Sequence, residues 1–353
     1  MTIKSNHLFR VNLPLKSILA GAVLGAVSIS PALSTEIPAS IKALIPAAQK
    51  EGAAMVWGIT LNPRQIAGMN KGFNDFYGTN IKITHRGGAH GVKAGEIARA
   101  YKAGVPTGVD VFWTAAPASV IKAGALVKID WHKEFGVDPA LQMSEYGVST
   151  HHSTSTMITV NSDLVKVSEE PRTYDDLLDP KWKGRIAITR SPRPWMQVVY
   201  GISEAKAVEL LEGLLIKQKA KVLPRVMNVK SRVLGGEYAI GIGTDAFTEI
   251  AKGAPVRHPN MKNLLLNTGG AWIVKDSKSK NVAKIWGFWA VSEEGQKVLH
   301  KVRGFSLVST KGTDLNRYAT GRKTHVMPAD WRLKNQSRLV KKFSAILKKH
   351  KNR

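Results

Sequence analysis

The stretch EPRTYDDLLDPKWKGRIAI, Glu170–Ile188, shows how the middle of the chain is organised. Its first four residues read as a loop that ends in an N-cap, and YDDLLD reads as a short helix. Pro180 breaks that helix, because a proline inside a helix removes a backbone donor and clashes with the preceding turn. GRIAIT, residues 184–189, then reads as a buried strand that ends at Arg190.

On both sides of this stretch the chain alternates between short apolar strands and helical segments, which favours βαβ units and a mostly parallel sheet. The predicted strands lie at 53–57, 80–85, 108–113, 155–161, 184–189 and 238–243, and the predicted helices at 40–51, 62–76, 92–103, 204–219, 282–290 and 293–301. Residues 264–275 read as a strand pair or one bent strand. A chain of 353 residues is too long for one compact core, so we expect two α/β lobes.

The first 34 residues have the pattern of a secretory signal peptide. Three basic residues, Lys4, Arg10 and Lys16, precede the apolar run ILAGAVLGAVSI, Ile18–Ile29. After the run, Ala32 and Ser34 supply the small residues of a cleavage site. The apolar run is too short for a stable membrane span, although an uncleaved anchor is the alternative. We therefore expect a mature periplasmic chain that starts near Thr35.

The chain is strongly basic and has no cysteine. Losing a leader with three basic and no acidic residues lowers the formal net charge from +26 to +23. Such a charge favours anionic partners, and in an exported protein it points away from nucleic acid. The positive net charge is equally explained as an adaptation of an envelope protein to anionic surfaces. The absence of cysteine excludes disulfides and thiolate metal sites.

Two glycine motifs suggest nucleotide or anion binding. GIGTDA, residues 241–246, matches the dinucleotide pattern, but residues 258–275 lack the acidic residue that should hold a ribose. RGGAHG, residues 86–91, is not a P-loop, but a glycine loop that opens a helix can bind an anion. The alternative for RGGAHG is a tight turn.

Other chemistry finds little support in the residue pattern. His85, His90, His151 and His152 lack the spacing and the acidic neighbours of a metal site, so no metal and no cofactor are expected. We find neither a nucleophile elbow nor a distinctive carboxylate pair, so the chain is not expected to be an enzyme. A secreted enzyme or an envelope structural protein remains the alternative from a different class.

The tryptophans and the C-terminal tail each allow two interpretations. Trp57, Trp113 and Trp195 follow or end strands, where they could form a stacking surface or fill the core. The basic tail, 311–353, ends in a helix with Val340, Phe343, Ile346 and Leu347 on one face. We expect that helix to pack on the body with its lysines in solvent, and a helix on a membrane surface is the alternative.

The opening stretch resembles a segment of class II periplasmic solute-binding proteins of ABC importers, the group related to ferric-iron and polyamine binders. That segment runs Pro-Thr-aromatic-x-Asp-Leu-Leu-x-Pro-x-Trp-Lys-Gly-Lys/Arg-Ile, and here Arg172 separates the proline from the threonine. The segments SEEGQKVL, AWIVKDSKSKNVAK and KAGEIARAYKAGVPTGVDVFW are also similar to the group. The resemblance covers most of residues 50–312.

The resemblance implies a two-lobed α/β periplasmic binding protein class II fold with hinge strands and an interlobe cleft. Lobe 1 would take 35–150 plus 247–310, lobe 2 would take 151–246, and the tail 311–353 would pack on the body. The hinge strands would lie near Ser153–Thr159 and Gly243–Phe247. The protein would work as a monomer that delivers a small-molecule solute to an ABC permease in the inner membrane.

The implied ligand-binding residues come from the ends of inner strands, the glycine turn and the two crossings. They are Gly58, Thr60, Gly88, Ala89, His90, Trp113, Thr114, Ser155, Thr156, Arg190, Ser191, Trp195, Thr244 and Asp245. Arg190 is the leading candidate, because a guanidinium at a strand end can clamp a carboxylate or phosphate. A surface ion pair is its alternative role. Replacing it by alanine should weaken binding by about 2 kcal/mol or more.

The predicted solute is a small organic anion. Ferric-binding relatives hold iron with adjacent tyrosines, and those positions fall on about Ala246 and Phe247 in this chain. Fe(III) prefers anionic oxygen ligands, so direct ferric binding is disfavoured. A polyamine needs several cleft carboxylates, and Asp245 alone is too few. Ferric iron and polyamines nevertheless remain the alternatives within this fold.

Overall fold

The computed structural model describes residues 36–243 and 245–350. The predicted signal peptide and Thr244 lie outside the described residues. Within the part described, no helix is long and apolar enough to cross a membrane.

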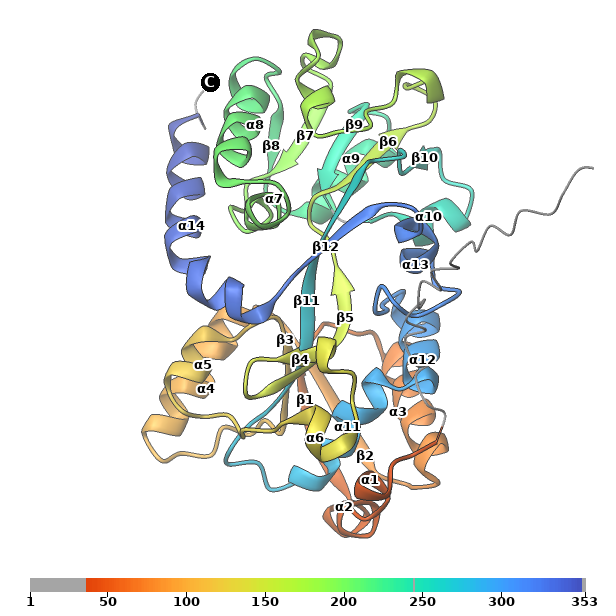
Figure 1. Ribbon diagram of the computed structural model, residues 1–353, viewed down its shortest axis with the longest axis vertical. Helices are drawn as coiled ribbons and strands as arrows, with labels where there is room; N and C mark the ends of the chain where they lie inside the picture. The colour runs from red at the N-terminus through yellow and green to blue at the C-terminus, as the bar shows by residue number, and fades with distance from the viewer. Residues whose placement is uncertain (1–35, 244, 351–353) are drawn as a thin grey trace, which may run out of the picture. The chain divides into compact units, whose positions relative to one another are not determined.

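The first sheet collects strands from both halves of the chain (Figure 1). Its order is β2-β1-β3-β11-β5-β4, and β12 pairs with β11 beyond this path. The strands are β1 (Ala53–Gly58), β2 (Lys82–Gly87), β3 (Val111–Thr114), β4 (Gln142–Met143), β5 (Gly147–Ser153), β11 (Asn263–Ile273) and β12 (Lys323–Met327). The first three strands are parallel as predicted, but β11 is antiparallel to β3 and β5, so the sheet is mixed.

The second sheet has the order β10-β6-β9-β7-β8. Its strands are β6 (Met157–Asn161), β7 (Ile186–Thr189), β8 (Lys221–Leu223), β9 (Ile240–Gly243) and β10 (Val256–Arg257). β7 runs parallel to β8 and β9, whereas β6 is antiparallel to β9 and β10. Parallel β7 and β8 end at the same edge, which becomes important for the site.

Helices flank both sheets (Figure 1). They are α1 (Ala39–Lys42), α2 (Ile45–Glu51), α3 (Pro63–Tyr77), α4 (His90–Lys102), α5 (Ala118–Lys122), α6 (Trp131–Phe135), α7 (Trp195–Gly201), α8 (Glu204–Ile216), α9 (Val226–Leu234), α10 (Phe247–Ala251), α11 (Lys280–Val291), α12 (Glu293–Arg303), α13 (Asp314–Ala319) and α14 (Ala329–Lys349). The helix predicted within YDDLLD is a 3-10 turn, Asp175–Leu178, and a second turn, Pro180–Trp182, follows it. The predictions did not include the helices α5, α6, α7, α9, α10 and α13 or the strands β4, β5, β8, β10 and β12.

The chain passes between the sheets at 154–156 and again after β10. The first crossing lies where the resemblance predicted it. The second was expected near Gly243–Phe247, and that expectation is wrong, because Val256 and Arg257 still pair antiparallel with β6. Residues 247–257, which we expected in lobe 1, therefore continue the second sheet. The other lobe boundaries stay predictions.

The glycines of GIGTDA serve packing in the second sheet. A Cβ on Gly241 would lie 2.8 Å from Val233 Cγ2, so the missing side chain lets α9 pack closely on β9. α10, which follows the strand, has only five residues. The glycine at 241 therefore serves a helix–strand contact.

Two large apolar cores hold the sheets and helices together. In the first, Trp113, Trp286 and Trp289 are almost completely buried together with Phe73. In the second, α14 contributes Leu339, Phe343 and Leu347, and the Trp195 ring stacks on Phe343 with centroids 6.2 Å apart. The C-terminal helix thus packs on the second core and leaves Lys334, Lys341 and Lys348 exposed.

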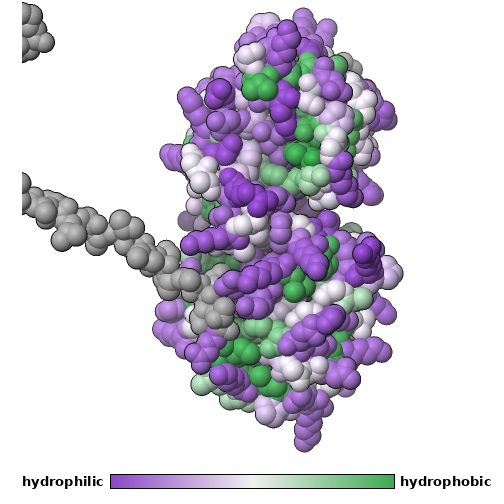
Figure 2. Space-filling view, turned by 90° about the vertical axis from the view of Figure 1, so that its right-hand side faces the viewer, coloured by the Kyte–Doolittle hydropathy of each residue, from purple (hydrophilic) through white to green (hydrophobic). Residues whose placement is uncertain are grey.

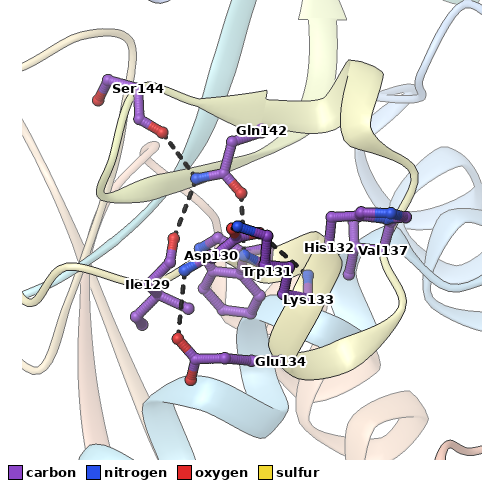
Figure 3. A network of polar contacts seen from close by, with 9 residues as sticks. All are labelled: Ile129, Asp130, Trp131, His132, Lys133, Glu134, Val137, Gln142 and Ser144. Atoms are coloured by element: carbon purple, nitrogen blue, oxygen red, sulfur yellow. Dashed lines mark hydrogen bonds and ion pairs between the residues drawn. The ribbon is translucent and has the colours of Figure 1, made fainter.

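A polar network fixes the short helix α6 in the first lobe (Figure 3). The Gln142 side chain accepts a hydrogen bond from the Trp131 N–H at 2.9 Å. Its amide group donates to the carbonyls of Ile129 and Ser144, at 3.0 and 2.7 Å. Asp130 caps the helix by accepting from the Lys133 N–H, which lowers the pKa of Asp130. The Gln142 side chain therefore joins the backbone at 129–131 to the backbone at residue 144.

Candidate ligand-binding site

A cavity of about 320 Å³ lies where the second sheet meets β11, β12 and α14. Its walls come from the first crossing, the ends of β7 and β8, the starts of α7 and α9, and the C-terminal segment. The lining residues are Ser155, Thr189, Ser191, Arg193, Pro194, Gln197, Pro224, Arg225, Val226, Asn267, Met327 and Arg332. The set mixes cations, neutral polar groups and apolar side chains.

Three arginines dominate the charge of this cavity. Arg193, Arg225 and Arg332 line it, and none of the lining residues is acidic. Across residues 36–243 and 245–350, no carboxylate oxygen lies within 4.0 Å of these three guanidinium groups. The cavity therefore has a positive potential that no side-chain carboxylate neutralises by direct contact.

Arg332 reaches the cavity from the first turn of α14. Its Nη1 donates to Asn267 Oδ1 at 2.7 Å, and its Nε donates to Gln336 Oε1 at 3.0 Å. Burial, together with the nearby charge of Arg193, lowers the pKa of Arg332 to about 10. Arg332 is still protonated at neutral pH, so two like charges face the same small volume.

The second lobe adds backbone donors to these cations. Parallel β7 and β8 end beside the cavity, and Arg225 is the N-cap residue of α9. In the described chain the N–H groups of Val226 and Met227 have no acceptor. An uncapped helix start carries partial positive charge and offers such donors to anions.

A cluster from the first lobe faces Arg193. His90, the first residue of α4, has its Nδ1 2.6 Å from Thr114 Oγ1, and its ring meets Trp57 edge-on at 5.9 Å. Burial is the main cause that lowers the pKa of His90, and the charges of Arg193 and Arg332 lower it further. A Cβ on the next residue, Gly91, would lie 4.0 Å from Arg193 Nη2. The start of α4 therefore lies beside the arginine side of the cavity.

The structure brings some of the predicted site residues together. His90 and Thr114 are in contact, and a hydrogen bond that the His90 ring donates to the Gly58 backbone favours the protonated form of the ring. Gly58 must be a glycine, because a Cβ there would lie 2.0 Å from the Trp113 carbonyl oxygen. Ser155 and Ser191 line the cavity.

Other predicted residues do not line this cavity. Thr156 is buried, and its hydroxyl donates to Gln197 Oε1 at 3.2 Å. Thr60 is exposed and packs against Gly87, while Gly88 and Ala89 form the exposed turn before α4. Asp245 contributes a charge that raises the pKa of His258, although burial lowers the pKa of that histidine overall.

Two predicted roles need correction. Trp113 and Trp195 are 1% and 3% exposed and fill the two cores, so they offer no free face for stacking on a solute. Arg190 directly follows β7 as expected, but it is exposed and does not line the cavity. The arginine three positions later, Arg193, takes the place that we expected for Arg190.

The sequence analysis also missed several lining residues. Arg193 lies in RSPRPW, close to the predicted strand end, and could have been considered with Arg190. Arg225 follows β8, a strand that we did not predict. Arg332 and Asn267 meet only through the tertiary fold, so no local pattern could have found them.

Iron-type ligands are sparse in the described residues. These ranges hold no group of three or more His, Cys, Asp or Glu side chains that could bind a metal ion. At the positions where ferric-binding relatives carry tyrosines, Ala246 is buried and Phe247 packs edge-on against His258 and Tyr318.

Comparison with known proteins identifies the class. A family model described as bacterial extracellular solute-binding protein matches residues 69–319, which is most of the chain. The chain belongs to this family. It is the extracellular solute-binding component of an ABC importer, and its family is not enzymatic. Among curated protein sequences, none matched.

Solved structures share the fold at low sequence identity. Iron-bound HitA from Pseudomonas aeruginosa is 19% identical with a TM-score of 0.63, over 82% of this chain and 99% of HitA. The apo ferric ion-binding protein A of Pasteurella haemolytica is 17% identical with a TM-score of 0.66, over 85% and 98%. AfuA from Actinobacillus pleuropneumoniae with fructose-6-phosphate is 19% identical with a TM-score of 0.61, over 84% and 99%. These likenesses confirm the two-lobed fold predicted from the sequence.

Proposed function

We propose that this solute-binding protein takes a small organic anion into the arginine-lined cavity and delivers it to a membrane permease. The observation that carries the proposal is the cavity wall itself, with Arg193, Arg225 and Arg332 and no acidic residue. A bound anion would neutralise charges that are otherwise uncompensated, and a guanidinium binds carboxylate or phosphate oxygens through paired hydrogen bonds.

The shape and chemistry of the wall indicate an organic rather than a simple inorganic anion. Pro194, Pro224, Val226 and Met327 offer apolar surface next to the cations. Ligand sites commonly combine such apolar walls with a few polar groups that fix orientation. His90 and the start of α4 would approach the same ligand from the first lobe if the lobes close by a hinge motion.

The alternatives within the fold fit this wall less well. A polyamine would place further positive charge beside three arginines, which raises its free energy of binding. Bare Fe(III) would find neither carboxylate nor phenolate among the lining residues. The iron named in the HitA structure and the fructose-6-phosphate named in the AfuA structure show that this fold accommodates very different ligands.

Partners and location complete the proposal. We expect the protein to act as a periplasmic monomer, exported by a cleavable signal peptide, without binding nucleic acid. Basic residues outnumber acidic ones, 52 against 26, and hydrophilic residues predominate on the face in Figure 2. We assign that surface charge to the anionic surroundings of the envelope rather than to ligand selection.

A thermal-shift screen tests the function directly, because a ligand that binds only the folded protein raises its melting temperature. The panel should contain organic acids, sugar phosphates, spermidine and ferric citrate, and hits should be titrated by calorimetry. We expect stabilisation by one or more organic anions. Tight spermidine or bare ferric binding, with no response to any anion, would overturn the proposal.

A further inference from the structure

The C-terminal segment adds to the cavity a cation that lies outside the family match. The matched residues end at 319, whereas Met327 and Arg332, both lining residues, lie beyond them on β12 and α14. β12 pairs in parallel with the first five residues of β11, and this pairing brings the start of α14 next to Asn267.

Hydrogen bonds at Arg332 itself and further along α14 fix the position of Arg332. On one side its Nη1 and Nε are hydrogen-bonded to Asn267 and Gln336. On the other, Glu204 of α8 binds Arg338 through two hydrogen bonds of 2.8 Å and Lys342 through one of 2.7 Å. Side chains further along α14 also enter the second core. Arg332 is therefore an anchored part of the cavity, with its Nη2 group free of any acceptor in the described chain.

Arg332 and Arg193 together set the charge that a ligand must supply. They come from α14 and from the loop before α7, and both line the same cavity. A ligand with one negative charge leaves one of the two guanidinium groups uncompensated, whereas a ligand with two charges at one end compensates both.

We propose that Arg332 makes the cavity selective for anions that carry two negative charges at one end, such as a phosphoryl, phosphonyl or geminal dicarboxylate group. The inference rests on the proposed function, because it concerns the same cavity. It assigns the charge selectivity to a segment beyond the family match, with Asn267 and Gln336 as positioning residues.

Small probe anions test the inference without assuming the natural ligand. Sulfate, methylphosphonate, malonate and acetate should be titrated by calorimetry at pH 8.5, where the first three carry two charges and His90 is neutral. We expect the doubly charged probes to bind the wild type about tenfold or more tighter than acetate. Comparing methylphosphonate with malonate then separates a phosphoryl-like from a dicarboxylate ligand.

The matched variants are Arg332→Gln and Lys341→Gln. Both remove one positive charge from α14, but Lys341 is exposed and does not line the cavity. In Arg332→Gln the difference in affinity between sulfate and acetate should shrink to about threefold or less, with acetate affinity nearly unchanged. In Lys341→Gln this difference should persist. Circular dichroism and the melting temperature establish that both variants fold.

The outcomes separate the two claims. If acetate binds the wild type as tightly as sulfate, or if Arg332→Gln keeps the full gap, the inference is wrong while anion binding stands. If none of the probes and no organic anion of the wider panel binds the wild type, both the inference and the proposed function fail.

Discussion

Arg332 and Asn267 are joined by a hydrogen bond of 2.7 Å although 65 residues separate them in the chain. The bond links the C-terminal helix to β11, the strand that returns from the second sheet to the first. It directs a cation into the cavity, so that the tail forms part of the candidate binding site.

Removing the Asn267 amide should weaken anion binding. In Asn267→Ala the Arg332 guanidinium loses one of its two hydrogen-bond partners, and we expect the dissociation constant for sulfate to rise about fivefold, which corresponds to about 1 kcal/mol. Asn335→Ala is the control, because Asn335 only donates to a carbonyl within α14. Equal effects of the two substitutions would count against a positioning role for Asn267.

Gln142 should be important for stability. In Gln142→Ala the Trp131 N–H and two carbonyls lose their partner (Figure 3). We expect the free energy of unfolding to fall by about 2 kcal/mol, measured by urea denaturation. Gln49→Ala, an exposed position on α2, should change it by less than about 0.5 kcal/mol. A Gln142→Ala protein as stable as the Gln49→Ala protein would show that water replaces these bonds.

Buried histidines should make the protein sensitive to mild acid. Burial lowers the pKa of His152 from 6.5 to about 4, and its Nδ1 accepts from the Val308 N–H at 3.0 Å. The unfolded chain binds a proton near pH 6.5 and the folded protein does not, so stability is lost as pH falls from 6.5 towards 4. His152 alone accounts for about 3 kcal/mol of that loss.

Denaturation at pH 7.5, 6.0 and 4.5 measures this dependence. In His152→Gln the free energy of unfolding should fall less steeply between pH 6.5 and 4.5, because glutamine cannot take up the proton. His132→Gln is the control, since His132 is exposed on α6, with its Nδ1 2.9 Å from the Val137 carbonyl oxygen. A curve of wild-type steepness in His152→Gln would show that His85 and His151, whose pKa values burial also lowers, dominate.

The ion pairs of Glu204 should stabilise the docked C-terminal helix. Hydrogen bonds from Arg338 and Lys342 lower the pKa of Glu204 from 4.5 to about 2. The contribution is therefore complete above pH 4.5 and is lost as pH falls towards 2. Because the pair is partly exposed and screened by solvent, Glu204→Gln should cost about 1 kcal/mol at pH 7 and much less near pH 2.5. The same loss at both pH values would rule out an electrostatic origin.

Features that depend on neighbouring residues could be predicted from the sequence, whereas features that depend on contacts between distant residues could not. The strand–helix alternation around Val56 and Ile83 indicated α/β units because hydrophobic periodicity is a local signal. The two-lobed fold was implied by the resemblance of the segment Glu170–Ile188 to solute-binding proteins. The cavity was only partly predicted. Ser155, Ser191 and His90 follow or precede predicted elements, whereas Arg332 meets Asn267 only because β12 pairs with β11.

The misassigned arginine shows the same limit at close range. Arg190 directly follows β7, where a strand-end rule places a ligand group, yet the chain continues through SPRP before α7 begins at Trp195. That short loop brings Arg193 to the cavity wall and leaves Arg190 exposed. Its path depends on the fit of Trp195 in the core, which the sequence does not reveal.

The most direct test of the central claim compares Arg193→Ala with Arg190→Ala in calorimetric titrations with the tightest organic anion from the screen. We predict that Arg193→Ala weakens binding about tenfold or more, as expected for a lost charged hydrogen-bond partner, while Arg190→Ala stays within about twofold of the wild type. Unchanged affinity in Arg193→Ala would contradict the assignment of the arginine-lined cavity as the anion site.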